Sequence, residues 1–443
     1  MTAILLATSL LWGRAQAPAH AQAETEPRPV PDYDGRGEPP TTAGDVVIWF
    51  PRVLLSPLYI ASEYVLRRPL GLLIVEIERG DAHFLVHAFT LSKKSNFGIV
   101  PTAYFEFGFH ANAGVYVFAD HVLAEPHGFR LHAATGGVHY WKVTFEDRLE
   151  LDPRGARVSL RVHASNRRDY LFSGIGPDAA NDLVSRYRSR RLDGSLRLEL
   201  ESWAPLGLVA ELGVRDRDFG RGACCDDPGV HELVDQGTLA ALPPGFAEGF
   251  TAWFQRLELA FDSRGHVGDH GHRLEVYGEQ AFDLDVLARR WIAYGATGAL
   301  YFPTVGPRRT MGLAVGAYFV DPLGDAEVPF SEQALLGGDG LLRGFREGRL
   351  HGRSALVASL EYQWPLWVWL QAVLQVAAGN VYGPHLAGLA PESLRGSAAI
   401  GFRTAESSPD HGFELLFALG TETVEQGMGI DTVRVLLGAT EGF

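Results

Sequence analysis

Long segments of alternating polarity run through most of this chain after residue 96. Residues 157–167 place four apolar side chains on one face of an extended strand, namely Val158, Leu160, Val162 and Ala164. Successive side chains of a strand point to opposite faces, so this spacing predicts a strand with one apolar and one polar surface. Many segments have about ten or more residues, the length that a tilted strand needs to cross a bilayer. A soluble sandwich would need strands of only about five or six residues.

The alternating segments predict an antiparallel barrel of about sixteen strands, an even number as in single-chain bacterial barrels. They are residues 97–107, 112–122, 127–136, 138–150, 156–168, 184–202, 204–217, 249–262, 271–283, 287–301, 308–321, 352–365, 368–380, 393–403, 411–421 and 430–439. With the amino terminus on the periplasmic side, the outer loops should be the long ones, as residues 169–183, 218–248 and 322–351 are. The predicted fold is therefore all-β, a single transmembrane barrel within residues 95–443.

The sixth outer loop, residues 322–351, carries a glycine-rich motif. Its candidate functional residues are Gly337, Gly338, Leu342, Arg343, Gly344 and Phe345. Glycines permit turns with positive φ and close backbone approach, and Arg343 offers a planar set of donors that suits a carboxylate. Counting by twos along residues 352–365 places Leu360 toward lipid and Glu361 in the lumen, so we predict that Glu361 binds Arg343. On the loop alone, an ordinary hairpin with a solvated arginine is the simpler alternative.

Composition favours the same class of protein. The chain has 443 residues, of which 11% are aromatic, 51 are Gly and only 3 are Met, which suits an all-β protein better than a helical one. A formal net charge of −14 argues against nucleic-acid binding, which needs concentrated Lys and Arg. The sequence contains no uninterrupted apolar run of 18 residues, so helical membrane spans are not expected.

The first 75 residues predict an exported chain with a short helical segment before the barrel. Residues 1–23 read as a signal peptide, with an apolar core and small residues before a cleavage point near Glu24, although a positively charged start is missing. Residues 24–43 are rich in Pro, Glu and Gly and predict a disordered spacer. Residues 44–75 predict an amphipathic helical segment at the membrane surface or against the barrel, and a helix in an ordinary protein core is the alternative.

Several motifs resemble those of the BamA/TamA-like bacterial surface antigens, a superfamily of outer-membrane assembly factors. Residues 342–345 are similar to its Val-Arg-Gly-Phe signature, and residues 356–365 are similar to the following strand with its Ser-x-Glu. Residues 172–178 resemble a Tyr/Phe-x-Gly-Ile-Gly-Asn segment of these barrels, and Phe443 resembles their aromatic carboxyl-terminal signal. The resemblance covers residues 95–443.

The resemblance implies that loop six folds into the lumen, where Arg343 pairs with acidic residues of the strands that follow. Ala377 stands where the family has an aspartate, so one carboxylate of the usual clamp is missing. The interval before the first strand is too short for several POTRA domains, so the chain resembles a short subgroup that lacks them. The resemblance further implies a Gram-negative outer membrane, a periplasmic amino-terminal segment, contact with outer-membrane lipids, protein or lipid clients, and help from the barrel assembly machinery during biogenesis.

Other candidate chemistry is sparse, and we expect no enzyme, cofactor or metal site. Cys224 and Cys225 are adjacent in a predicted outer loop, where a vicinal disulfide and a pair of ordinary thiols are both open. His266, His270 and His272 lie near a periplasmic turn, but nothing defines a full ligand set. Acidic and basic residues alternate on the lumenal faces, for which mutual ion pairing is the simplest interpretation.

Two classes of function follow. In the first, the barrel opens or thins the bilayer at the seam between its first and last strands and assists insertion or movement of protein or lipid. In the second, it is a passive plugged barrel or narrow pore with the arginine loop as its constriction. A soluble lipid-binding β protein is a more distant third.

Overall fold

The computed structural model describes residues 96–122, 124–152, 155–179, 183–203, 205–264, 270–304, 309–366, 370–404 and 411–441. The predicted signal peptide, spacer and helical segment in residues 1–75 lie outside the described residues, as does Phe443.

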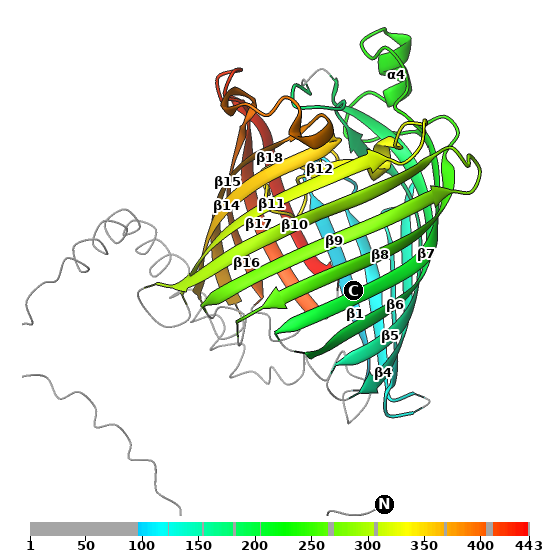
Figure 1. Ribbon diagram of the computed structural model, residues 1–443, viewed down its shortest axis with the longest axis vertical. Coiled ribbons are helices and arrows are strands. Elements are labelled where there is room, and N and C mark those ends of the chain that lie inside the picture. The colour runs from blue at the N-terminus through cyan, green and yellow to red at the C-terminus, as the bar shows by residue number, and fades with distance from the viewer. Residues whose placement is uncertain are drawn as a thin grey trace, which may run out of the picture. The chain divides into compact units, whose positions relative to one another are not determined.

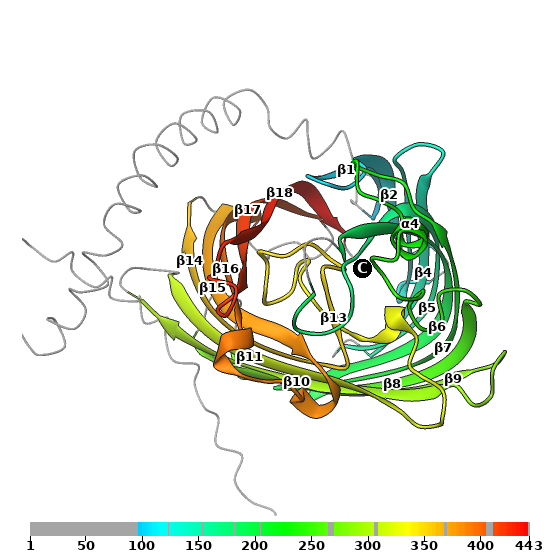
Figure 2. The same ribbon diagram turned by 90° about the horizontal axis from the view of Figure 1, so that it is seen from above.

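Sixteen antiparallel strands form a closed barrel (Figures 1 and 2), so the predicted fold class is confirmed. The barrel strands are β1 (Phe97–Glu106), β2 (Asn112–Asp120), β3 (His127–Thr135), β4 (Tyr140–Asp152), β5 (Ala156–Phe172), β6 (Ser185–Trp203), β7 (Leu206–Arg221), β8 (Phe250–Asp262), β9 (Gly271–Asp283), β10 (Arg290–Pro303), β11 (Thr310–Pro322), β14 (Ser354–Pro365), β15 (Leu370–Tyr382), β16 (Arg395–Thr404), β17 (His411–Thr423) and β18 (Ile430–Glu441). Each strand pairs with its neighbours in the chain, β11 pairs with β14, and β18 closes the ring on β1.

The side-chain alternation has the predicted sense along the strands. On β5, Leu160 is 48% exposed on the outer surface, while Ser159 and Ser165 are buried on the lumenal side. On β14, Leu360 is exposed, whereas Ser359 and Gln363 are buried. Apolar side chains on the outer surface favour a barrel wall that faces lipid, because large contiguous apolar surfaces are rare on soluble proteins. Within the described part of the chain, no helix has the length and apolarity needed to cross a bilayer.

The lumen contains both ion pairs and an apolar core. Arg197 lies 2.6 Å from Glu199, and Arg256 lies 3.0 Å from Glu258 and 3.7 Å from Glu279, as expected for a polar interior. Toward the rim with the longer loops, however, buried aromatic residues fill the barrel, including Phe172, Tyr187, Phe219, Phe246 and Phe330. Ring centroids of Phe219 and Phe330 are 4.9 Å apart. Phe246 and Phe330 come from two long loops that fold inward, where they pack against Phe172, Tyr187 and Phe219 of the barrel strands, and burial there removes these side chains from water.

The long loops contain short elements that the sequence pattern did not predict. They are the helix α4 (Val230–Asp235), the 3-10 turns η3 (Phe330–Glu332), η4 (Pro384–Leu386) and η5 (Pro391–Ser393), and the hairpin of β12 (Ala334–Leu336) and β13 (Leu350–Gly352). Three residues are too few for a period of two to be recognised. Figure 2 shows β13 inside the ring of barrel strands, and Figure 1 shows α4 above the rim.

Candidate functional site: the lumenal loop and the strand seam

Loop six, here residues 323–353, folds back into the barrel as a short hairpin. Leu335 pairs with His351 in the β12–β13 ladder, and the tip between these strands carries the glycine-rich motif. Gly337 and Gly338 have φ values of +112° and +62°, a region that side chains with a Cβ rarely adopt. The amide of Gly338 donates to the carbonyl of Phe345 at 2.9 Å, which closes the tip.

The motif packs tightly against the inner barrel wall. Leu342 and Phe345 are fully buried in the lumenal core. Between them, the amide of Gly344 donates to Oγ of Ser397 on β16 at 2.8 Å. A Cβ on Gly344 would meet the carbonyl oxygen of Leu419 on β17 far inside van der Waals contact. The glycine is therefore needed for close backbone approach rather than for a positive φ.

Arg343 lies between two lumenal carboxylates. Its Nη1 donates to Oε1 of Glu414 on β17 at 3.2 Å, and its Nη2 lies 4.0 Å from Oε2 of Glu361. Arg343 and Glu414 are each 13% exposed, and Glu361 is 16% exposed. Glu361 also lies 3.4 Å from Arg403 of β16 and accepts a 2.5 Å hydrogen bond from Gln363. Glu361 is thus near Arg343, but the shorter contact belongs to Glu414.

Glu414 supplies a second carboxylate where Ala377 lacks one. Ala377 on β15 stands in register with Ser359 and Ser397, so its position on the lumenal wall is the one expected. The acidic residue comes instead from β17, where Glu414 is in register with Arg403. Sequence reasoning missed Glu414, although it is an isolated acid within the apolar run Phe413–Leu419 and stands at a position of period two.

A second set of contacts holds the return arm of loop six. Arg349 lies 3.0 Å from Asp431 of β18, and Arg395 of β16 lies 3.3 Å from the same carboxylate. Both arginines also donate to the carbonyl of Ala179, in the loop after β5. In the same loop, the amide of Gly176 donates to the carbonyl of His351 at 2.8 Å. The segment 172–178, singled out in the sequence, therefore packs against loop six.

Among the titratable groups of loop six, Glu332 and His351 have shifted pKa values. Burial acts to raise the pKa of Glu332, but Arg215 and Arg217 outweigh it, so that pKa is lowered; Arg215 lies 2.5 Å from the carboxylate. Burial lowers the pKa of His351 to about 4. The His351 ring lies 5.5 Å from that of Phe172 and 6.2 Å from that of Phe330, measured between centroids. At neutral pH, His351 therefore acts as an uncharged core side chain.

The barrel closes at a short seam. The β1–β18 ladder joins three pairs of residues, Tyr104 with Gly438, Phe105 with Leu437 and Glu106 with Leu436. By contrast, β1 pairs with β2 over eight residues, from Phe97 to Tyr104. In the described part of the chain, Phe97 to Ala103 have no register partner on β18. Backbone donors and acceptors along this edge are consequently not all used within the sheet.

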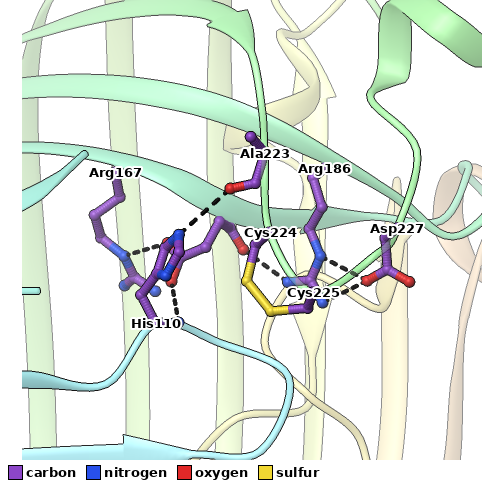
Figure 3. The surroundings of a disulfide bond; sticks show 8 residues. His110, Arg167, Arg186, Ala223, Cys224, Cys225 and Asp227 are labelled. Atoms are coloured by element: carbon purple, nitrogen blue, oxygen red, sulfur yellow. Dashed lines mark hydrogen bonds and ion pairs between the residues drawn. A yellow bond between two sulfur atoms is a disulfide. The ribbon is translucent and has the colours of Figure 1, made fainter. Parts of the chain in front are cut away.

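Cys224 and Cys225 form a vicinal disulfide at the base of the loop after β7, so the first of the two alternatives is the one observed (Figure 3). The turn lies against the β1–β2 turn, where Nε2 of His110 is 3.3 Å from the carbonyl of Ala223. Fully buried Arg186 binds Asp227 at 2.7 Å beside it. The described residues contain no group of three or more His, Cys, Asp or Glu arranged to hold a metal ion, and His266 lies outside them.

Comparisons with known proteins agree with this architecture. Residues 253–404 match the Omp85 superfamily domain. The fold is similar to the crystal structure of BamA from Haemophilus ducreyi lacking POTRA domains 1-3, with a TM-score of 0.54 and 15% identity over 78% of this chain and 70% of that one. It is also similar to CdiB from Acinetobacter baumannii, with a TM-score of 0.50 and 11% identity over 77% of this chain. The chain spans 59% of that CdiB chain, and no curated protein matches it by sequence. Residues 253–404 therefore match the Omp85 superfamily domain, and they lie within a sixteen-stranded barrel whose fold is similar to that of BamA.

Proposed function

We propose that this protein is an outer-membrane assembly barrel that assists insertion or movement of protein or lipid through the seam between β1 and β18. The observation that carries the proposal is the three-pair β1–β18 ladder in a barrel whose β10–β11 ladder joins thirteen pairs. A strand edge with unused backbone groups is a template for pairing with another strand, and a short ladder costs less to separate than a long one. The Omp85 superfamily domain and the BamA-like fold support the assembly class.

The arginine loop has a structural role in this proposal. Arg343, held by Glu414 with Glu361 nearby, keeps loop six in the lumen, where its apolar side chains complete the core. A filled lumen blocks free diffusion through the barrel centre and leaves the seam as the route for a client. Outer-membrane lipids and protein or lipid clients are the proposed partners, with the barrel assembly machinery acting during biogenesis.

The predicted amino-terminal regions belong to the same proposal. A signal peptide in residues 1–23 would export the chain, the spacer in 24–43 would follow it, and the helical segment in 44–75 would lie on the periplasmic side of a Gram-negative outer membrane. This placement agrees with the long loops being at the opposite rim from the amino-terminal end of β1.

A passive plugged barrel or narrow pore is the second candidate, favoured by the aromatic core in the lumen. A variant that lacks residues 337–349 distinguishes the two functions. The conductance of the purified variant is measured in planar bilayers, and the outer-membrane composition is measured in the strain that carries the deletion. The assembly function predicts altered outer-membrane protein or lipid composition in the deletion strain. A large, steady channel combined with a normal outer-membrane composition would contradict the assembly function and support the passive one. Heat-dependent gel mobility serves as the control that the deleted barrel still folds.

A further inference from the structure

Arg434 is a buried arginine at the seam. It lies on β18, is 1% exposed, and its Nε donates to Oε1 of Glu106 on β1 at 2.5 Å. The Glu106 carboxylate is 4% exposed and accepts a second hydrogen bond, of 2.6 Å, from the hydroxyl of Tyr104. This ion pair therefore crosses the seam on the lumenal side, beside the three-residue ladder.

The same guanidinium also binds the tip of loop six. Nη2 lies 3.0 Å from Oδ1 of Asp339, and Nη1 donates to the carbonyls of Gly338 and Arg343. The loop contacts thus include the backbone of Arg343, the residue whose side chain binds Glu414. One arginine consequently contacts both edges of the seam and the motif of loop six.

These contacts depend on one another. A buried guanidinium needs partners, and removing some of them leaves a desolvated charge that is poorly compensated. If loop six leaves the lumen, Arg434 loses Asp339 and two carbonyls, while Glu106 remains its partner. If β1 separates from β18, Glu106 loses its ion pair in a buried site. Each event removes part of the environment that the other needs.

The space beside the network permits such movement. A cavity of about 390 Å³ borders Tyr104, Glu106, Asp339, Leu436 and Gly438. Side chains on both sides of the seam can therefore rearrange without first displacing a packed core.

We propose that Arg434 is a positioning residue that couples the lumenal docking of loop six to closure of the β1–β18 seam. The inference rests on the proposed function for its biological meaning, because only a seam that opens needs such a coupling. The coupling itself is a property of the barrel and can be measured without a client. By linkage, a closed seam stabilises the docked loop as much as a docked loop stabilises the closed seam.

The test locks the seam and measures release of the loop. Phe105 and Leu437 are register partners, 43% and 44% exposed on the outer surface, so Phe105→Cys with Leu437→Cys places a reducible crosslink across the seam. Cys224→Ser with Cys225→Ser removes the native disulfide, which the reductant would otherwise open together with the crosslink. Trypsin cleavage after the arginines of loop six reports release, in purified barrels with the crosslink oxidised or reduced.

Crosslinking should slow cleavage of loop six about tenfold when Arg434 and Glu106 are present. In Arg434→Met with Glu106→Gln, which removes both buried charges and leaves only the 71% exposed carboxylate of Asp339 without its partner, oxidised and reduced barrels should be cleaved at the same rate. The control is Arg161→Met with Glu146→Gln, a lumenal ion pair between β5 and β4, which are not seam strands, in which Glu146 is 6% exposed and Arg161 is 31% exposed. This variant should keep the tenfold difference. Heat-dependent gel mobility verifies that each variant is folded.

A crosslink effect of equal size with and without the Arg434–Glu106 pair would overturn the coupling. Outer-membrane composition in the strain carrying the double variant is scored separately. If the double variant loses the crosslink effect while its strain keeps a normal outer-membrane composition, the proposed assembly role of the seam is contradicted. The coupling role of Arg434 would still stand.

Discussion

At the residue scale, Gly344 sets how closely loop six can approach the barrel wall. Gly344→Ala should release the loop from β16 and β17, because the added methyl group would collide with the backbone of Leu419. Overpacking of this kind costs about 1–3 kcal/mol. Release of the loop should appear as faster trypsin cleavage of loop six. Gly340→Ala is the matched control in the same loop, since its nearest neighbour would be the carbonyl of Gly337 at 3.4 Å, and it should be cleaved at the original rate.

The two carboxylates near Arg343 should differ in their effect on the loop. Glu414→Gln removes the carboxylate that Arg343 contacts at 3.2 Å, and losing a charged hydrogen bond in a mostly buried site costs about 2 kcal/mol. Glu361→Gln should cost less, because Glu361 is 4.0 Å from Arg343 and also lies near Arg403. Thermal unfolding and loop cleavage measure both variants. Equal effects, or a larger effect of Glu361→Gln, would show that Glu414 is not the main partner.

At the scale of single elements, strands were predictable and short loop elements were not. Each barrel strand of at least nine residues displays enough repeats of period two to identify it, as β9 does with ends that match the prediction at Gly271 and Asp283. The β12–β13 hairpin has three residues in each strand and depends on the surrounding lumen for its burial. Its apolar residues become core residues only after the loop has folded inward, which local periodicity does not encode.

The β12–β13 hairpin should be sensitive to acid. Because the pKa of His351 is lowered to about 4 in the docked loop, the exposed imidazole binds protons more readily than the docked one. The contribution of His351 to docking of the hairpin is therefore fully present above the ordinary histidine pKa of about 6.5. The free energy of docking weakens by up to about 3 kcal/mol as the pH falls toward 4. His351→Gln should flatten this part of the pH profile of loop cleavage by an acid-stable protease. His272→Gln, at an exposed position of β9, should leave the profile unchanged, and an unchanged profile in His351→Gln would contradict the prediction.

At the scale of the whole molecule, the ring of strands should have one weak place. Amide hydrogen exchange should be faster in β1 and β18 than in β10 and β11, because the β1–β18 ladder joins three residue pairs and the β10–β11 ladder joins thirteen. Exchange followed by mass spectrometry of peptides from the purified barrel measures this difference. The disulfide of Phe105→Cys with Leu437→Cys should slow amide exchange at the seam and leave the exchange rates of β10 and β11 unchanged. Uniform exchange around the barrel would count against a seam that opens.

The sequence by itself determined the strand count, the lipid-facing and lumenal faces, and the motif of loop six, because each depends on the spacing of neighbouring residues along one strand or turn. Only the tertiary structure decided which lumenal groups meet. Glu414 reaches Arg343 from a strand three places beyond that of Glu361, and Arg434 joins β18 to Glu106 on β1, 328 residues away in the chain. Such contacts arise from the curvature of a closed sheet and from a loop folded inside it. Periodicity reports which face a side chain occupies, whereas the partner across the lumen follows from closure of the ring.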